Sequence, residues 1–413
     1  MTLRRSTLIY YALPAFSLAM LGLPLYIYLP TFYTQYVGLS TLEVGLVLFF
    51  ARTLDLIFDP LIGSLSDRFA KRKMMMLLGM LTLLTGFLAL SYPQATWTWL
   101  LTFSFIAYSG WSLMSIPYLA LSAELAKTYH DNTRLASTRE LFTIVGLVSA
   151  LVIPYLLNTA ENAQATIQLM LIIVTLTLPI LFLIFYKKIE EPQRLSKAMG
   201  FISGLKLIWT HDPDARSLFL AFLSNSLANA LPATLFLFFV SYVLKTPEQT
   251  GAFLILYFIS GLCALPVWLY LSKIWGKKKT WISSMVFASL AFSFVPLLGS
   301  GDTFYFMIIT LLSGLCLGAD MALPAAIQAD IAQKFEKTGN SLTGVLFGFW
   351  AMLTKFSLAL AVGISFGILG LVGFEPTLPT ENALNVLSFL YGMAPVIFKT
   401  LAIFLIYKYH DEA

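Results

Sequence analysis

Three ionisable residues stand close together within one apolar stretch of this chain. Arg52, Asp55 and Asp59 lie in VGLVLFFARTLDLIFDPLIG, separated by three and four residues. On a helix, these spacings place all three side chains on one stripe. An ionised side chain at the centre of a membrane helix costs about 2.5–3.5 kcal/mol on insertion scales. Such groups therefore indicate an ion pathway, a proton relay or a permanent structural pair.

The two carboxylates favour a cation site. Acids one helical turn apart repel each other in a low dielectric, so either one is protonated or a cation lies between them. Oxygen ligands suit Na⁺, Li⁺ or H⁺ rather than a transition metal. The alternative is that Arg52 or Lys355 pairs permanently with the acids as structural glue. We favour the cation site at Asp55 and Asp59, because pairing alone would not require two acids.

Other apolar stretches contain polar residues that could complete this site. Ser112, in GWSLMSIPYLAL, offers a hydroxyl ligand, although membrane-helix serines commonly serve helix packing. Lys355, in FGFWAMLTKFSLALAVGISFGILG, is far from both ends of its stretch and needs an acidic partner. With Arg52, it would balance the charge near the cation site. Lys399 lies nearer the end of its stretch, where we expect it to reach the interface.

Composition restricts the class of protein. The 413 residues are 58% hydrophobic and 11% charged, whereas an ordinary soluble domain is about 25% charged. The mean hydropathy of +0.81 then leaves only a polytopic membrane protein. The net charge of +5 does not indicate nucleic-acid binding, because the basic residues lie in short loops between apolar stretches. Without a nucleophilic triad, a phosphate-binding loop or a metal-ligand cluster in the sequence, we expect no enzyme activity and no cofactor other than a coupling Na⁺ or H⁺.

Stretches of about twenty apolar residues predict an all-α membrane protein with twelve transmembrane helices. The predicted spans begin near residues 8, 42, 74, 97, 140, 166, 217, 250, 280, 303, 342 and 384. One set of alternating loops and the tails holds 22 of the 26 Lys and Arg residues. By the positive-inside rule, both termini and the long middle loop are cytoplasmic. The expected location is a bacterial-type inner (plasma) membrane. We expect a monomer whose partners are the lipid bilayer and a small-molecule substrate.

An internal repeat divides the chain. Shifting residues 23–73 by 206 places Gly45 on Gly251 and Pro60 on Pro266, and the turn RFAKRK falls on IWGKKK. We therefore predict a six-helix half at 1–186, a cytoplasmic middle loop at 187–216 and a second six-helix half at 217–413. Two halves of this kind imply a solute site at mid-membrane depth that opens alternately to each side.

Charged residues near the cytoplasmic ends of the spans suggest a gate. In GSLSDRFAKRK, Gly63 permits close helix approach, while Asp67 and Arg68 could latch a helix in one conformation. Glu124 and Arg134, beside Arg139 and Glu140, could form a second lock. In the matching region of the second half, we expect Asp330 to be a solvated loop charge, and the place of Asp320 is open.

These motifs resemble the major facilitator superfamily. GSLSDRFAKRK is similar to its cytoplasmic loop motif, and RTLDLIFDPLIG, IPYLALSAEL, TRLASTRELF, ADMALPAAIQADI and GFWAMLTKFSLALA resemble the glycoside–pentoside–hexuronide:cation symporters, the melibiose-permease-like branch. The resemblance implies that Asp55 and Asp59 bind the coupling cation with help from Ser112. It also implies that Lys355 lies beside that site and that Arg139 helps to hold a sugar. The same branch includes sodium-dependent lysophospholipid carriers.

The substrate-binding positions depart from the family pattern. Ala19 and Ser115 stand where the melibiose-type carriers place sugar-binding aspartates, and Phe58 replaces an asparagine beside the second cation-site acid. A galactoside is therefore not the expected substrate. Six side chains are candidates for solute binding. They are Tyr26, Trp111, Ser115, Tyr118, Arg139 and Trp350.

We predict a secondary active transporter that moves a small polar solute with Na⁺ or H⁺. A sugar, glycoside or anionic sugar derivative is the first hypothesis, because Arg52, Arg139 and Lys355 exceed the two acids by one positive charge. Two alternatives remain open: an amphiphile such as a lysophospholipid, suggested by the 34 Phe, and a proton-driven exporter. A third hypothesis, from a different class, is a non-transporting sensor on a carrier scaffold, which would need a cytoplasmic output domain.

Overall fold

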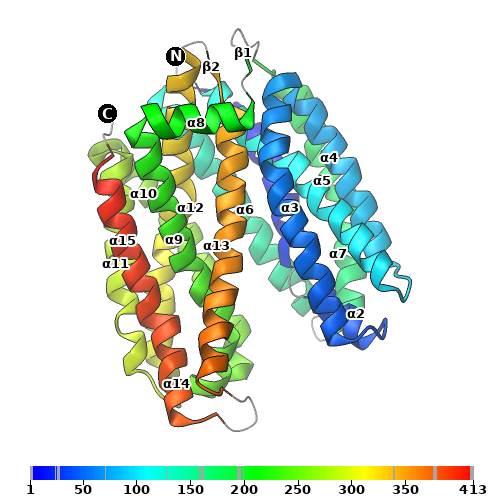
Figure 1. Ribbon diagram of the computed structural model, residues 1–413, viewed down its shortest axis with the longest axis vertical. Helices are drawn as coiled ribbons and strands as arrows, with labels where there is room; N and C mark the ends of the chain where they lie inside the picture. Colours follow the sequence, from blue (N-terminus) through cyan, green and yellow to red (C-terminus); the bar gives the residue numbers. More distant parts are fainter. Residues whose placement is uncertain are drawn as a thin grey trace. The chain divides into compact units, whose positions relative to one another are not determined.

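The computed structural model describes most of the chain (Figure 1). The described residues are 3–23, 25, 28–69, 71–126, 128–157, 159, 162–192, 197–198, 200–337, 340–374 and 379–409. Within them the protein is almost entirely helical, as predicted, and ten helical segments are long and apolar enough to cross a membrane. The one departure from an all-α chain in this part is a pair of two-residue parallel strands, β1 (Lys197–Ala198) and β2 (Asn340–Ser341).

Every one of the twelve predicted spans overlaps a helix. The helices of the first half are α1 (Arg5–Leu23), α2 (Leu29–Gln35), α3 (Thr41–Phe69), α4 (Arg72–Ser91), α5 (Trp97–Leu125), α6 (Tyr129–Leu156) and α7 (Ala163–Lys188). Those that follow are α8 (Phe201–His211), α9 (Pro213–Phe238), α10 (Thr250–Trp275), α11 (Lys277–Phe292), α12 (Thr303–Lys337), α13 (Thr343–Leu371), α14 (Glu381–Ser388) and α15 (Ala394–Tyr407). Helix α9 continues into a π-helical turn, Phe239–Leu244, and another such turn, Phe389–Met393, joins α14 to α15.

Helix α7 shows why these stretches form membrane helices. Its exposed side chains include Ile172, Leu176, Ile180 and Leu183, which recur at helical spacing. Other apolar residues between them, such as Val174, Leu178 and Phe182, are buried. A helix that is apolar on all faces has no side suited to water, so its outer face is suited to lipid.

The chain forms two compact units. The first comprises Met1–Lys206 and Gln328–Met352, and the second comprises Leu207–Ile327 and Leu353–Ala413, so the boundary falls within α12 and α13. In the first unit, α4 packs on α5 and α1 on α6; in the second, α9 packs on α15. Each unit has its own apolar core, and the second core includes Phe239 stacked on Tyr391 at 4.3 Å between ring centroids.

The helix bounds repeat along the chain with the shift seen in the sequence. Helix α3 ends at Phe69 and α10 ends at Trp275, while α5 begins at Trp97 and α12 at Thr303. Both pairs are 206 residues apart. The pseudo-symmetry of the two halves is therefore present in the secondary structure. The division at residues 187–216 remains a prediction about the sequence halves.

Candidate functional site

Four buried residues form one row along α3. Asp55, Asp59, Gly63 and Asp67 follow one another at intervals of four, which places them on one face of the helix. Asp55 is 5% exposed, Asp59 is fully buried and Asp67 is 3% exposed. The row joins the predicted cation site to the predicted gate.

The first acid of the row contacts the predicted hydroxyl ligand. Ser112, on α5, donates a hydrogen bond from Oγ to Oδ1 of Asp55 at 3.0 Å, and Ser112 is 1% exposed. Helices α3 and α5 pack against each other along this level. The structure therefore brings Asp55 and Ser112 together, with Asp59 one turn further along α3.

Two prolines add oxygen acceptors close to this pair. Pro60 in α3 and Pro117 in α5 have no N–H, so the carbonyls of Leu56 and Leu113 lack their usual helical donor. Each of these carbonyls is adjacent in sequence to Asp55 or Ser112. Carboxylate, hydroxyl and carbonyl oxygens are the ligand types that an alkali cation accepts, so the local chemistry suits a hard cation.

The other residues assigned to this site lie differently. Arg52 and Phe58 are exposed on α3, whereas Asp55 and Asp59 are buried. Lys355 is half-buried on α13 and belongs to the second unit, so its place beside the acids stays a prediction.

One turn after Asp59, α3 packs closely on the start of α13. The contact is made by Gly63 and by Gly344 and Gly348, the two glycines of a GxxxG sequence. A methyl group on Gly348 would lie 2.7 Å from the main-chain oxygen of Asp59. Small residues at this spacing allow two membrane helices to approach with their backbones in contact. Gly63 therefore stands at a close helix approach, as its type suggests.

The last acid of the row binds the end of the same helix. The Asp67 carboxylate accepts hydrogen bonds from the N–H groups of Gly344 at 2.7 Å and Val345 at 2.9 Å. These are among the first N–H groups of α13, which have no partner within the helix. A carboxylate there also interacts favourably with the helix dipole. Asp67 thus caps α13 from another part of the sequence.

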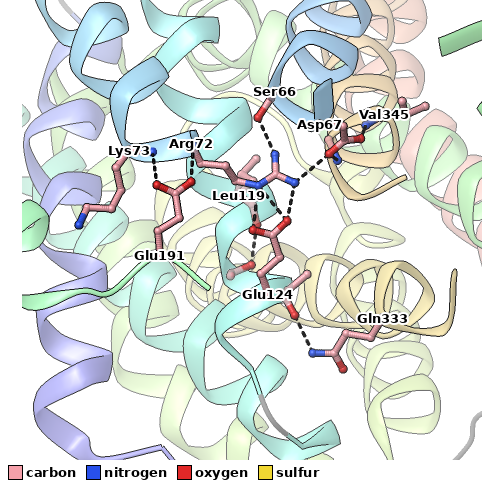
Figure 2. A network of polar contacts seen from close by, with 12 residues as sticks. Ser66, Asp67, Arg72, Lys73, Leu119, Glu124, Glu191, Gln333 and Val345 are labelled. Atoms are coloured by element: carbon pink, nitrogen blue, oxygen red, sulfur yellow. Dashed lines mark hydrogen bonds and ion pairs between the residues drawn. The ribbon is translucent and has the colours of Figure 1, made fainter. Parts of the chain in front are cut away.

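Arg72 holds Asp67 in place (Figure 2). Its guanidinium lies between two carboxylates, at 2.9 Å from Asp67 and 2.6 Å from Glu124 of α5, and it also donates to Ser66 at 2.5 Å. Arg72 is fully buried. The N–H of Arg72 donates to Glu191, which follows α7. We call these five residues the Arg72 network.

Two of the charged residues predicted for the gate lie outside the Arg72 network. Arg68 is exposed, because it follows Asp67 by one position and so turns about 100° away from the buried row. Arg134 donates instead to Asp131 at 3.3 Å and to the carbonyl of Leu3 at 3.1 Å. In the sequence, Arg72 is hidden in a basic turn that also serves as a topology signal, so its type alone did not distinguish it.

Asp330 is not a solvated loop charge, which corrects our expectation. It lies in α12, where its Oδ1 accepts a hydrogen bond from Asn132 of α6 at 2.7 Å. Gln333, on the next turn, donates to the carbonyls of Ala123 and Ala126 at 2.7 and 2.8 Å. The end of α12 is thereby fastened to the end of α5, because a helix C-terminus leaves carbonyls that need donors.

Two of the six candidate solute residues, Arg139 and Tyr118, are held by internal bonds. Arg139 is buried and pairs with the adjacent Glu140. Tyr118 donates to the carbonyl of Tyr11 at 2.6 Å, and Tyr11 donates to the carbonyl of Tyr118 at 2.9 Å. Their rings lie 4.7 Å apart. This part of α1, α5 and α6 is a pre-formed polar and aromatic cluster.

The remaining candidates for solute binding differ in how far they are exposed. Trp111 and Ser115 are half-buried on α5, and Trp350 is 7% exposed on α13. Ala19 is 7% exposed on α1. Tyr26 lies outside the described residues. Their roles in solute binding stay predictions.

Lys399 does not reach the interface, which overturns the expectation for that residue. Its side chain is 7% exposed, and its ammonium lies 2.5 Å from the Asp320 carboxylate of α12. The expectation considered only the distance to the end of the span. A buried ammonium within a membrane span needs an acidic partner, and Asp320 on another helix provides it.

Known proteins are similar to this chain over most of its length. A family model described as "MFS/sugar transport protein" matches residues 10–410. The chain is 26% identical to the inner membrane symporter YicJ of Escherichia coli K12, over 93% of this chain and 87% of that protein. It is 24% identical to the sodium-dependent lysophosphatidylcholine symporter 1-A of Danio rerio, over 95% of this chain and 83% of that protein.

Solved structures share the fold. The E. coli fucose:proton symporter FucP aligns with a TM-score of 0.67 at 15% identity, covering 96% of this chain and 99% of that one. A bacterial homologue of the iron transporter ferroportin aligns with a TM-score of 0.70 at 15% identity, covering 98% and 99%.

Proposed function

Because this chain belongs to the MFS/sugar transport protein family, we propose that it is a cation-coupled symporter of a small polar solute, with the cation bound at Asp55 and Asp59. The observation that carries the proposal is the buried contact between Ser112 and Asp55, one turn from the fully buried Asp59. A sugar, a glycoside or an anionic sugar derivative is the proposed solute, and Na⁺ or H⁺ is the proposed cation.

The cation lowers the cost of keeping two acids one turn apart. Without it, the repulsion between Asp55 and Asp59 favours a rearrangement of α3 or a protonation. With it, carboxylate oxygens, the Ser112 hydroxyl and the carbonyls of Leu56 and Leu113 can share one hard ion. By linkage, a solute that binds the cation-bound state better also tightens cation binding by the same factor.

Helix α3 provides the route from the ion to the gate. Asp59 stands at the level where α13 touches α3 through Gly348, and two turns further Asp67 caps α13. A small rotation of α3 at the acids would shift both contacts, because packed helices move as rigid elements between discrete arrangements. We propose that the Arg72 network forms in one access state and breaks in the other.

The cation site can be tested without knowing the solute. Purified protein is unfolded by heat in detergent while Na⁺ replaces choline at constant ionic strength, and pH is varied in parallel. A ligand that binds only the folded state at about 100 times its Kd stabilises it by about 2.7 kcal/mol. We expect this cation stabilisation in the wild type and in the exposed control Glu248→Gln, and its loss in Asp55→Asn and Asp59→Asn.

Transport is then measured by counterflow in vesicles with labelled methyl β-D-glucoside, glucuronate and lysophosphatidylcholine. Uptake should depend on the cation in the wild type and lose that dependence in Asp55→Asn. The proposal fails if both acid variants keep the wild-type response to Na⁺ and to pH. A response to pH alone would identify H⁺ as the coupling ion.

An amphiphile is the second candidate solute. The observation that favours it is the similarity to a symporter named for lysophosphatidylcholine over 95% of this chain. Its distinguishing result is cation-dependent uptake of lysophosphatidylcholine that methyl β-D-glucoside does not inhibit.

A further inference from the structure

Four helices of the second unit converge on one carboxylate. Asp320, on α12, accepts hydrogen bonds from Lys399 of α15 at 2.5 Å, from the indole of Trp281 of α11 at 3.1 Å and from the amide of Asn229 of α9 at 3.3 Å. The Lys399 ammonium also donates to Asn225 of α9 at 2.8 Å. None of these residues belongs to the cation site proposed above.

The members of this cluster differ in exposure. Trp281 is fully buried, Asn225 is 1% exposed, and the side chains of Asp320 and Lys399 are each 7% exposed. Asn229 alone is exposed. The exposed Asn229 therefore connects the ion pair to an open surface of the second unit.

The depth of Asn229 indicates what that surface faces. Asn229 lies near the middle of the apolar span Pro213–Leu244. A polar side chain exposed to hydrocarbon there would leave its amide without hydrogen-bond partners, which is costly. Polar residues within membrane spans face a bundle interior or a water-filled cavity. We therefore expect this surface to border water.

Asp320 and Lys399 carry opposite formal charges and lie in contact, so their charges balance within the cluster. A carboxylate has about four acceptor positions, and three described donors occupy three of them. The exposed Asn229 amide offers both an acceptor and a donor beside the remaining position. A hydroxyl group, which donates and accepts at once, matches this arrangement. An anion does not, because it would approach a carboxylate.

The backbone near the cluster is also interrupted. Pro324 in α12 and Pro232 in α9 have no N–H, so the carbonyls of Asp320 and Ala228 lack their usual helical donor. Broken helical ladders at mid-membrane depth are tolerated where they line a cavity, and they mark solute sites in transporters.

We propose that Asn229 and Asp320 form a solute-binding subsite in the second unit that takes hydroxyl groups of a neutral solute, with Lys399 as a positioning residue. The proposal rests on the transport function proposed above and narrows its solute to a hydroxylated, uncharged one. It does not depend on which cation drives transport.

The first test asks whether Asn229 meets water. Cysteine replaces Asn229 in a Cys263→Ala background, because Cys263 is exposed and Cys316 is buried. The matched control is Leu220→Cys, which is exposed on the opposite side of α9. A charged, water-soluble methanethiosulfonate should modify Asn229→Cys at least about tenfold faster than Leu220→Cys. Equally slow modification of both would place Asn229 against lipid and overturn the proposal.

The second test identifies the chemistry of the subsite. Glycerol, methyl β-D-glucoside and sucrose, which are neutral and hydroxylated, are each compared with glucuronate and lysophosphatidylcholine as protectants of Asn229→Cys. At least one neutral compound should slow modification. Protection by glucuronate or lysophosphatidylcholine alone, or by none of the five, would overturn the assignment.

Uptake separates this subsite from a purely structural ion pair. Asp320→Asn leaves a buried ammonium without its counter-ion, so the neutral double variant Asp320→Asn with Lys399→Met serves to preserve folding. We expect that double variant and Asn229→Ala to raise KM for the transported neutral solute at least about tenfold, with cation stabilisation unchanged. Glu248→Gln is the control. Unchanged KM in both variants, with cation stabilisation lost in Asp55→Asn, would reject the subsite and leave the proposed function intact.

Discussion

The two halves place a basic residue at the same point and use it differently. The repeat shift brings Arg72 onto Lys278, each at the start of the helix after a basic turn. Arg72 is fully buried between Asp67 and Glu124, whereas Lys278 donates to the carbonyls of Tyr407 and Tyr409 at the end of α15. The repeat thus conserves the helix bounds and the basic charge but not the role of that charge.

The acids explain the difference. The position that matches Asp67 in the second half is Lys273, so no acid stands one turn before the second basic turn. Without that acid, an ammonium at Lys278 finds the carbonyls of a helix C-terminus, which attract cations. With two acids, the planar guanidinium of Arg72 can bind both through separate N–H groups. Among the described residues, the first half uses this acid to hold α13.

The largest effect is expected from removal of Arg72, and comparison with removal of Lys278 tests the difference between the halves. Arg72→Ala would leave Asp67 and Glu124 buried without their counter-ion, so we expect a loss of about 3–5 kcal/mol in unfolding free energy. Lys278→Ala should cost about 1 kcal/mol, because it removes bonds to carbonyls at a half-buried site. Both are measured by denaturant unfolding followed by tryptophan fluorescence. Equal losses in the two variants would show that the halves use this position alike.

A second variant sharpens the contrast at the α3–α13 contact. Gly348→Ala would place a methyl group 2.7 Å from the main-chain oxygen of Asp59, so the helices must separate. We expect a destabilisation of about 1–3 kcal/mol together with a reduced rate of cation-driven uptake. Gly363→Ala, on the same helix, meets no atom within 4 Å and should be neutral or stabilising by up to about 1 kcal/mol. Identical behaviour of the two glycine variants would contradict a functional contact at Gly348.

The smallest effect concerns the single hydroxyl on Asp55. Ser112→Ala removes one hydrogen bond, worth about 0.5–1.5 kcal/mol, so the Na⁺ concentration for half-maximal stabilisation should rise about two- to tenfold. Ser104→Ala, a fully buried serine on the same helix, should leave it unchanged. Na⁺ titrations of thermal unfolding measure both. No change in Ser112→Ala would remove the hydroxyl from the cation site.

Much of the fold followed from the sequence because membrane helices are specified locally. A stretch of about twenty apolar residues must satisfy its own backbone, so each predicted span overlaps a helix. The repeat likewise appeared in both sequence and helix bounds. The starts of helices followed less closely from the sequence. The span expected near residue 140 belongs to a helix that begins at Tyr129, because the polar start of α6 carries no apolar signal.

The site was only partly readable. Asp55, Asp59 and Ser112 stood out because a polar group in an apolar stretch is costly, and Asp67 stood out for its motif. Arg72 and the pairing of Lys399 with Asp320 did not, because a basic residue in a basic turn or near a span end already has an ordinary explanation.

Along one helix, the sequence by itself determined which residues share a face, since that depends only on helical geometry; the row Asp55, Asp59, Gly63 and Asp67 is of this kind. The tertiary structure alone decided which helix each charge would meet. A buried charge is stabilised by partners far away in sequence, as Asp67 is by α13 and Lys399 by Asp320, and no local pattern specifies them.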